Sequence, residues 1–311
     1  MKPILRKPKV IFTFGSHASE NRHGTPKKPG FFTNTVLFEH SSGTRKEPDL
    51  VAMRDMKGKF AEEQREYFEA AKKKGARVLA AEYPVNRFEQ KGLGLLFERF
   101  QNSNLLFNFR PSVNNFKSAV ESLVNLNRAR DKIAKRMIKE SLKEGDVEVR
   151  RGSEHANLYH DLKREGVKVE RRVVSTQRDA LSRVARRLMM KLPVDEKQWR
   201  RAFVNSMLEQ VVSKLVYEVP LGQAKNFQIE ASIAAARAIT KTLTEKDIIE
   251  LANSPVPEMV LTSKGYPMGT DSRSRQMFTE KVMDILNSQP QYKRQIKLIR
   301  AAQEPNGIVA K

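Results

Sequence analysis

The stretch DVEVRRGSEHANLYHDLKREGVKVERRVV, residues 146–174, indicates the class of fold. Residues 146–155 are strand-like, residues 155–166 are helix-like, and residues 167–174 are strand-like again. A strand, a short helix and a second strand in succession are typical of parallel strands joined by a crossover helix. This stretch therefore predicts an α/β fold.

The sequence before this stretch continues the same alternation of strands and helices. Apolar, β-branched and aromatic runs predict three earlier strands, at residues 9–16, 34–43 and 77–84. Apolar residues at helical spacing predict two helices, at residues 59–76 and 120–145. We therefore expect residues 9–174 to form an α/β unit with a mainly parallel central sheet and flanking helices.

After residue 175 the pattern becomes mostly helical. Four runs predict helices, at residues 175–192, 194–219, 226–243 and 275–289. Residues 253–269 hold three prolines and two glycines and predict a loop. We expect an α/β domain at residues 1–175 and a helical extension or small helical domain at residues 176–311.

The composition limits the class of protein. The 311 residues include no cysteine, which excludes disulfides and thiolate zinc sites and fits a reducing compartment. No apolar run reaches the length of a membrane span, and the basic N-terminal segment lacks a small-residue cleavage site. We expect a soluble, cytoplasmic protein of unknown oligomeric state.

The net charge of +22 is the strongest feature of the composition. Basic residues are spread along the chain with acids between them, and no zinc knuckle, RNP-type strand or clear helix-turn-helix pattern is present. A chain of this charge attracts polyanions through counterion release. The charge predicts a non-specific affinity for nucleic acid.

Histidines and acids gather after the predicted strands. The five histidines are His17, His23, His40, His155 and His160. Three of these, His17, His40 and His155, lie at the carboxyl ends of predicted strands, and Glu20, Glu39 and Glu82 lie near the same ends. Ligands bind at this edge of an open parallel sheet. Imidazoles and carboxylates converging there predict a divalent metal site or a general acid–base pair.

The segment RDKIAKRMIKESLKEGDVEVRRGSEHANLYHDLKREGVKV resembles the closing segment of TraB-like proteins. These belong to a superfamily with the TIKI proteases, the ChaN-type proteins and the erythromycin esterases. The residues that match the pattern are Arg130, Asp131, Gly152, His155, Leu158, Leu162, Gly166 and Val169. The resemblance covers about residues 9–172.

The earlier motifs are similar in order and spacing. VIFTFGSHAS resembles the first strand and histidine motif of the family and matches His17, and the next two strands match Glu39 with Arg45 and Glu82 with Arg87. The chain departs from the pattern at Phe14, where the family has glycine, and at Glu82, where it favours aspartate.

The resemblance implies a hydrolase that cleaves a peptide or ester bond. The candidate catalytic residues are His17, Glu39, Glu82, Arg130, Asp131 and His155. A divalent ion of unknown identity would be held by His17, Glu39 and His155 and would activate water. A metal-free version, in which a carboxylate orients His17 as the base, is equally open. Arg130 and Asp131 would either fix the glutamates or meet an anionic substrate.

Other interpretations use the same residues differently. His155 could cap the helix that follows, with Arg130 and Asp131 as an ordinary ion pair. The protein could be a non-catalytic metal- or haem-binding module of the ChaN type, or a basic accessory protein that binds RNA or a ribosome. Met189 and Met190 lie on apolar helix faces, which favours a place in the core over haem ligation.

Overall fold

A computed structural model describes most of the chain. The described residues are 7–15, 33–38, 67–82, 84–152, 155–173, 179–217, 226–253, 259–261, 267–270, 280–285, 287–288, 294 and 297. The chain divides into two compact units, Met1–Phe97 with Asn125–Thr176 and Glu98–Val124 with Gln177–Lys311. The change of unit after Thr176 lies one residue from the predicted domain boundary, while residues 98–124 group with the C-terminal part.

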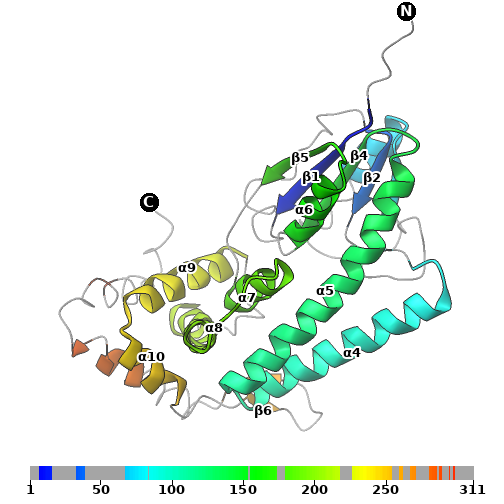
Figure 1. The fold of residues 1–311 in the computed structure, drawn as a ribbon. Coiled ribbons are helices and arrows are strands. Elements are labelled where there is room, and N and C mark those ends of the chain that lie inside the picture. Colours follow the sequence, from blue (N-terminus) through cyan, green and yellow to red (C-terminus); the bar gives the residue numbers. More distant parts are fainter. Residues whose placement is uncertain are drawn as a thin grey trace, which may run out of the picture. The chain divides into compact units, whose positions relative to one another are not determined.

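The first unit is built on a five-stranded sheet. Its strands are β1 (Val10–Gly15), β2 (Thr35–Phe38), β3 (Arg77–Ala80), β4 (Val147–Gly152) and β5 (Val169–Val173). They run parallel in the order β3-β2-β4-β1-β5 (Figure 1). The predicted parallel α/β fold and its five strands are thus confirmed, with shorter strands than the sequence predicted.

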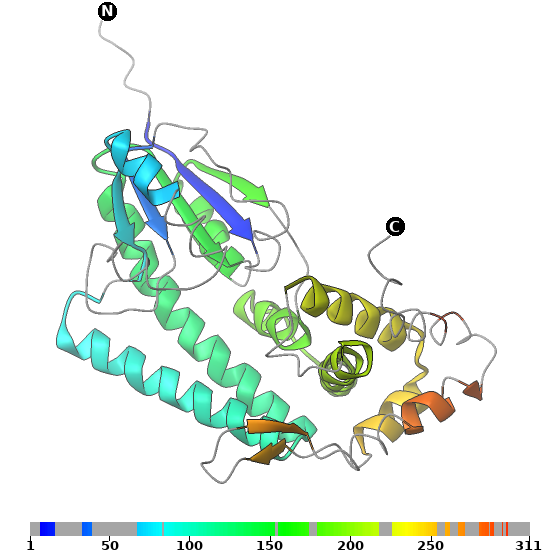
Figure 2. The same ribbon diagram turned by 180° about the vertical axis from the view of Figure 1, so that it is seen from behind.

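Side chains alternate between the two faces of this sheet, as the period of a β-strand requires. On one face, Leu37 and Val149 pack against Met137 of helix α5 (Val113–Ser141) and Leu158 of helix α6 (Ala156–Arg164). On the opposite face, Val36 and Val78 pack against Tyr67 and Phe68 of a helical segment at residues 67–73. Figure 2 shows that segment on the face turned away from α6.

Helix α4 (Arg87–Phe109) was not predicted. It runs beside α5 and contacts it through Glu89 with Arg136 near one end and Phe107 with Phe116 near the other (Figure 1). Phe88 and Leu95 are exposed, with 88% and 58% of their surface accessible, so the apolar residues do not form one stripe. This irregular pattern hides the helix from a periodicity search.

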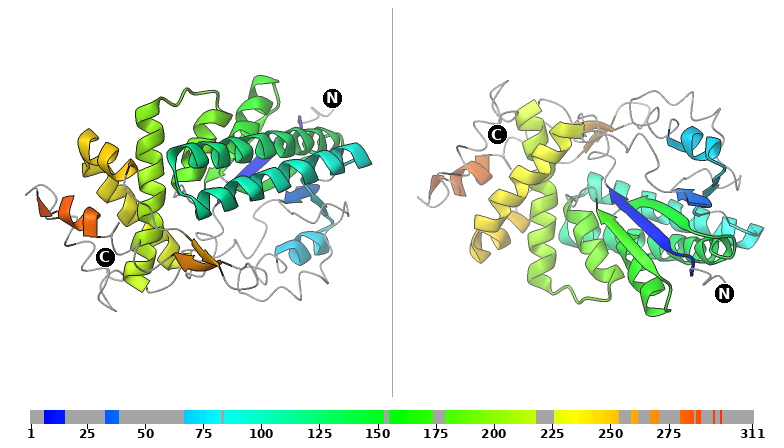
Figure 3. Two further views of the ribbon diagram at one scale, coloured as in Figure 1. Left: turned by 90° about the horizontal axis from the view of Figure 1, so that it is seen from below. Right: turned by 90° about the horizontal axis from the view of Figure 1, so that it is seen from above.

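The second unit has a helical core. Its helices include α7 (Ala180–Met189), α8 (Glu196–Tyr217), α9 (Asn226–Thr242) and α10 (Glu245–Ala252). Phe116, Trp199 and Phe203 form an aromatic cluster in its core, and α8 and α9 pack side by side (Figure 3). The helical character predicted for the C-terminal part is confirmed.

One prediction for this unit was wrong. Residues 253–269 were predicted as a loop, but β6 (Met259–Leu261) and β7 (Pro267–Thr270) form an antiparallel pair. The apolar run MVL is only three residues long and lies between proline-rich and glycine-containing segments, so the turn signals outweighed it. Within the described part of the chain, no helix is both long and apolar enough to cross a membrane.

Candidate functional site

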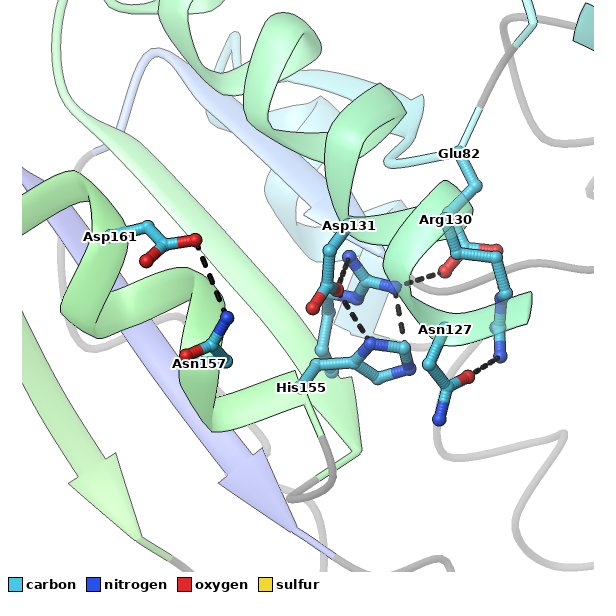
Figure 4. A network of polar contacts seen from close by, with 8 residues as sticks. Glu82, Asn127, Arg130, Asp131, His155, Asn157 and Asp161 are labelled. Atoms are coloured by element: carbon cyan, nitrogen blue, oxygen red, sulfur yellow. Dashed lines mark hydrogen bonds and ion pairs between the residues drawn. The ribbon is translucent and has the colours of Figure 1, made fainter. Parts of the chain in front are cut away.

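A buried polar network lies at the carboxyl edge of the central sheet (Figure 4). Glu82 follows β3 by two residues, Arg151 belongs to the end of β4, and His155 follows β4 by three residues. Helix α5 adds Arg130 and Asp131 from the face that packs toward the sheet. The network therefore joins three segments that are distant in the sequence.

The order of the strands favours a ligand site at this edge. The neighbours β1 and β4 lie near the middle of the sheet, and their residues pair from Val10 with Val147 to Gly15 with Gly152. The strand that follows β1 in the sequence, β2, lies toward the β3 edge of the sheet. The strand that follows β4 in the sequence, β5, forms the opposite edge. Ligands bind open α/β sheets where the chain changes direction in this way.

Glu82 is held by two arginines. The Nε atom of Arg130 donates to Oε2 of Glu82 at 2.7 Å, and Nη2 of Arg151 donates to Oε1. Arg130 also donates to the side-chain oxygen of Asn127 at 3.3 Å. Because both carboxylate oxygens accept charge-assisted hydrogen bonds, the orientation of Glu82 is strongly constrained.

Asp131 joins the second arginine to the histidine. Its Oδ1 atom lies 2.7 Å from Nδ1 of His155 and 3.1 Å from Nη1 of Arg151. The Nε2 atom of His155 lies 3.3 Å from Nη2 of Arg151. Because a guanidinium only donates, Nε2 accepts and Nδ1 carries the proton that is donated to Asp131. These contacts assign the neutral Nδ1–H form to His155.

The capping interpretation of His155 is wrong. His155 stands at the N-terminus of α6, but its side chain makes no capping hydrogen bond and is fully buried. The alternative in which Arg130 and Asp131 form an ordinary ion pair is also wrong. Arg130 binds Glu82, while Asp131 binds His155 and Arg151. The polar contact between Asn157 and Asp161 on α6, at 3.4 Å, lies apart from this network (Figure 4).

The structure brings four of the six predicted catalytic residues together: Glu82, Arg130, Asp131 and His155. The other two, His17 and Glu39, lie outside the described residues, as do Glu20, His40 and Arg45. The described part of β1 ends at Gly15, two residues before His17. The described part of β2 ends at Phe38, one residue before Glu39. Their place at the same edge stays a prediction.

Arg151 and Asn127 belong to the network but were not predicted. Arg151 is the last residue but one of the strand VEVRRG, and its side chain is fully buried in the centre of the sheet. Arginine is almost never buried without an ionic partner. An arginine in a strand that has a neighbouring strand on each side therefore indicates a buried ion pair. Asn127 lies one helical turn before Arg130, and this spacing alone is too common to single it out.

Strand β4 also has polar contacts on its other face. Tyr67 donates to Oε2 of Glu148 at 2.5 Å, and the guanidinium of Arg150 lies 4.2 Å from the centre of the Tyr67 ring. Burial, with Glu148 adding to the effect, raises the pKa of Tyr67 above its ordinary value. These contacts keep the phenol neutral and join the helical segment 67–73 to the sheet.

The described residues do not fit a metal ion at His155. No group of three histidine, aspartate or glutamate residues suited to an ion occurs in the described ranges. The lone pair of His155 Nε2 faces the guanidinium of Arg151, which would repel a cation placed there. The divalent ion stays a prediction that depends on residues outside the described ranges, His17 and Glu39 among them.

Comparison of the chain with protein-family models, with curated proteins and with solved structures finds no match. The TraB-like assignment therefore depends on the motifs in the sequence alone. It stays a prediction, and so do the activity and cofactor that it implies.

Proposed function

We propose that the protein is a hydrolase of the TraB/TIKI type that cleaves a peptide or ester bond at the carboxyl edge of the sheet. The observation that carries this proposal is the buried network of Glu82, Arg130, Asp131, Arg151 and His155. Burying several charges contributes little net stability, since desolvation offsets their attraction. Such clusters in a cleft or at a ligand-binding edge are typical of functional sites.

Arg130 is the member of the network best placed to meet a substrate. Its side chain is 20% exposed, whereas the side chains of Glu82 and Arg151 are 6% and 0% exposed. Glu82 holds Nε of Arg130, which orients the guanidinium plane. In the proposed reaction this guanidinium stabilises the negative charge that develops on the substrate carbonyl oxygen.

Asp131 and His155 act in the proposal as positioning residues. His155 is fully buried and its Nε2 faces Arg151, so it does not reach water in this arrangement. By holding Arg151, the pair keeps Glu82 and thereby Arg130 in place. We propose that His17, oriented by Glu39, removes a proton from water as the water attacks the carbonyl carbon, and then returns it to the leaving group.

A second candidate is a binding module without turnover. It is favoured by the saturated contacts of His155, whose Nδ1 and Nε2 both face partners inside the protein. In that case Arg130 would bind the anionic group of a ligand, and no group would activate water.

The two candidates differ in turnover, so the experiment measures hydrolysis of p-nitrophenyl acetate, a panel of fluorogenic peptides and labelled casein. Each assay is run with chelator and then with added Zn²⁺ or Mn²⁺. We expect Arg130→Ala to lower kcat/KM by about 10²–10³, as for the loss of an oxyanion donor. Lys132→Ala, an exposed cation two residues away on α5, is the control and should change it less than about twofold.

The proposal fails if the wild-type protein hydrolyses none of these substrates under any of the metal conditions. It also fails if Arg130→Ala and Lys132→Ala have the same activity. In the first case the binding module becomes the better explanation of the network, and in the second case Arg130 takes no part in the turnover.

A further inference from the structure

The helical unit contains a cationic pocket that the proposed hydrolase site does not use. Helices α7, α8 and α9 line it, and its volume is about 340 Å³. This volume lies within the usual range of small-molecule sites. None of the described lining residues is an acid. Five of them are cations: Arg183, Arg187, Arg201, Arg237 and Lys241.

Four of these cations form two facing pairs. Arg183 and Arg187 are four residues apart on α7, and Arg237 and Lys241 are four residues apart on α9. Residues at this spacing lie on the same helical face, where two like charges destabilise the helix. Both pairs line one hollow, which adds repulsion between the helices.

The fifth cation has a structural role. Arg201 donates to the carbonyl oxygens of Thr240 and Leu243 at 2.8 and 3.4 Å, where it caps the C-terminal end of α9. Arg187 donates to the carbonyl oxygen of Pro193 at 3.1 Å. For Arg237 and Lys241, by contrast, the described residues supply neither a hydrogen bond nor an ion pair.

The described acids beside the pocket do not neutralise its five cations. Glu245 lies 3.8 Å from Arg201, and Asp179 attracts Arg183. Glu209 lies 3.7 Å from Arg183, is only 2% exposed, and accepts hydrogen bonds from the backbone of Ala180 and from Asn205. Burial raises the pKa of Glu209 to about 8, so much of it is uncharged at neutral pH. Burial, with Arg237 adding to the effect, lowers the pKa of Arg183. The pocket therefore keeps an excess of positive charge.

We propose that this pocket binds a phosphate-bearing small molecule of nucleotide size, with Arg183, Arg187, Arg237 and Lys241 around the phosphate oxygens. Guanidinium groups match phosphate through paired donors, and an anion between the helices would relieve the repulsion of both pairs. Val184, Val194 and Ala202 line the same hollow and provide an apolar surface for the organic part of the ligand. A pocket bounded by three helices suits a compact ligand better than an extended strand of nucleic acid.

The test is isothermal titration of the full chain with ATP and, separately, with inorganic pyrophosphate. Arg237→Gln removes one cation from the pocket and should weaken binding at least about tenfold, the usual effect of losing a charge-assisted hydrogen bond. Arg237→Lys keeps the charge without the paired donors and should lie between this variant and the wild type. Lys246→Gln removes an exposed cation of α10 in the same unit and should change binding less than about twofold.

Several outcomes decide the matter. Similar affinity for pyrophosphate and ATP supports recognition of phosphate alone, whereas tighter binding of ATP supports a further contact with the apolar wall. The proposal is overturned if neither ligand binds at millimolar concentration, or if Lys246→Gln weakens binding as much as Arg237→Gln. It is also overturned if a single-stranded oligonucleotide binds while ATP does not. Melting curves of each variant check that the fold is intact.

Discussion

Among single residues, His155 links the acid and the arginine at the centre of the network. Its Nδ1 donates to Asp131 at 2.7 Å, and its Nε2 faces Arg151 at 3.3 Å. Oδ2 of Asp131 is buried and has no hydrogen-bond partner within the described residues, so Oδ1 carries the polar contacts of this carboxylate. The loss of the imidazole would leave a buried carboxylate with one partner fewer.

For this reason we expect His155→Ala to lower the free energy of unfolding by about 1–3 kcal/mol, the cost of leaving a buried polar group with too few partners. His160→Ala, on the partly exposed side of α6, should cost less than about 0.5 kcal/mol. Urea denaturation of both variants measures the difference, and equal midpoints would contradict the buried network.

Glu209 predicts a specific dependence of stability on pH. Its pKa in the folded protein is about 8, against 4.5 as the ordinary value, because of burial and the nearby Asp179. Between these values the folded state binds a proton that the unfolded state has lost, so this group makes stability fall as pH rises. Above about pH 8 its contribution no longer changes.

Glu209→Gln should remove this fall in stability. The uncharged amide can still accept the hydrogen bond from Ala180, so the variant should gain stability relative to the wild type as pH rises from about 5 to 8. Chemical denaturation at several pH values tests this expectation. Glu196→Gln, an exposed change at the start of α8 where Lys117 lowers the pKa of the carboxyl, should show no such trend in this range. Parallel curves for Glu209→Gln and the wild type would refute the raised pKa.

At the scale of elements, two glycines should respond in opposite ways to the same substitution. Gly166 follows α6 with a φ of +78°, a conformation that side chains disfavour, whereas Gly94 lies inside α4. A Cβ atom at either position would meet nothing within 4 Å. Packing is therefore removed from the comparison, and only the backbone preference remains.

We expect Gly166→Ala to lower the free energy of unfolding by about 1 kcal/mol, because alanine is strained at positive φ. Gly94→Ala should raise it by up to about 1 kcal/mol, because alanine favours the helix interior. Melting temperatures of the two variants give the signs directly. A loss of stability in Gly94→Ala would contradict the helical assignment of α4.

At the scale of the whole molecule, the charge of +22 predicts how the chain meets nucleic acid. We expect affinity for DNA and RNA to be weak, to be similar for unrelated sequences, and to fall steeply with salt, as for phosphate contacts without base readout. Fluorescence anisotropy with two unrelated oligonucleotides at several salt concentrations measures this. Tight, sequence-selective binding that persists at moderate salt would instead identify nucleic acid as the main partner.

The parallel sheet could be predicted because central parallel strands are nearly continuous apolar runs bounded by turn residues. Residues 9–16 were located correctly for this reason, and β1 lies within them. Strand β5 lies within the predicted residues 167–174, although it is an edge strand of sequence VERRV and no continuous apolar run. Helix α4 was missed because its apolar residues do not form one stripe. Helix α10 was missed although Thr244 and Asp247 form a capping box, a signal that short helices do display.

By itself, the sequence determined the order and type of most elements and identified Glu82, Arg130, Asp131 and His155 as members of one site. The polar residues after strands suffice for Glu82 and His155, because the carboxyl ends of parallel strands share an edge. Arg130 and Asp131 lie inside a helix and were indicated only by the resemblance to TraB-like proteins. Only the tertiary structure decided that Arg151 joins Glu82 to Asp131, that His155 is buried without capping α6, and that its Nε2 faces a guanidinium. These contacts join residues up to 69 positions apart, so they depend on the order of the strands and on the packing of α5, which periodicity does not encode.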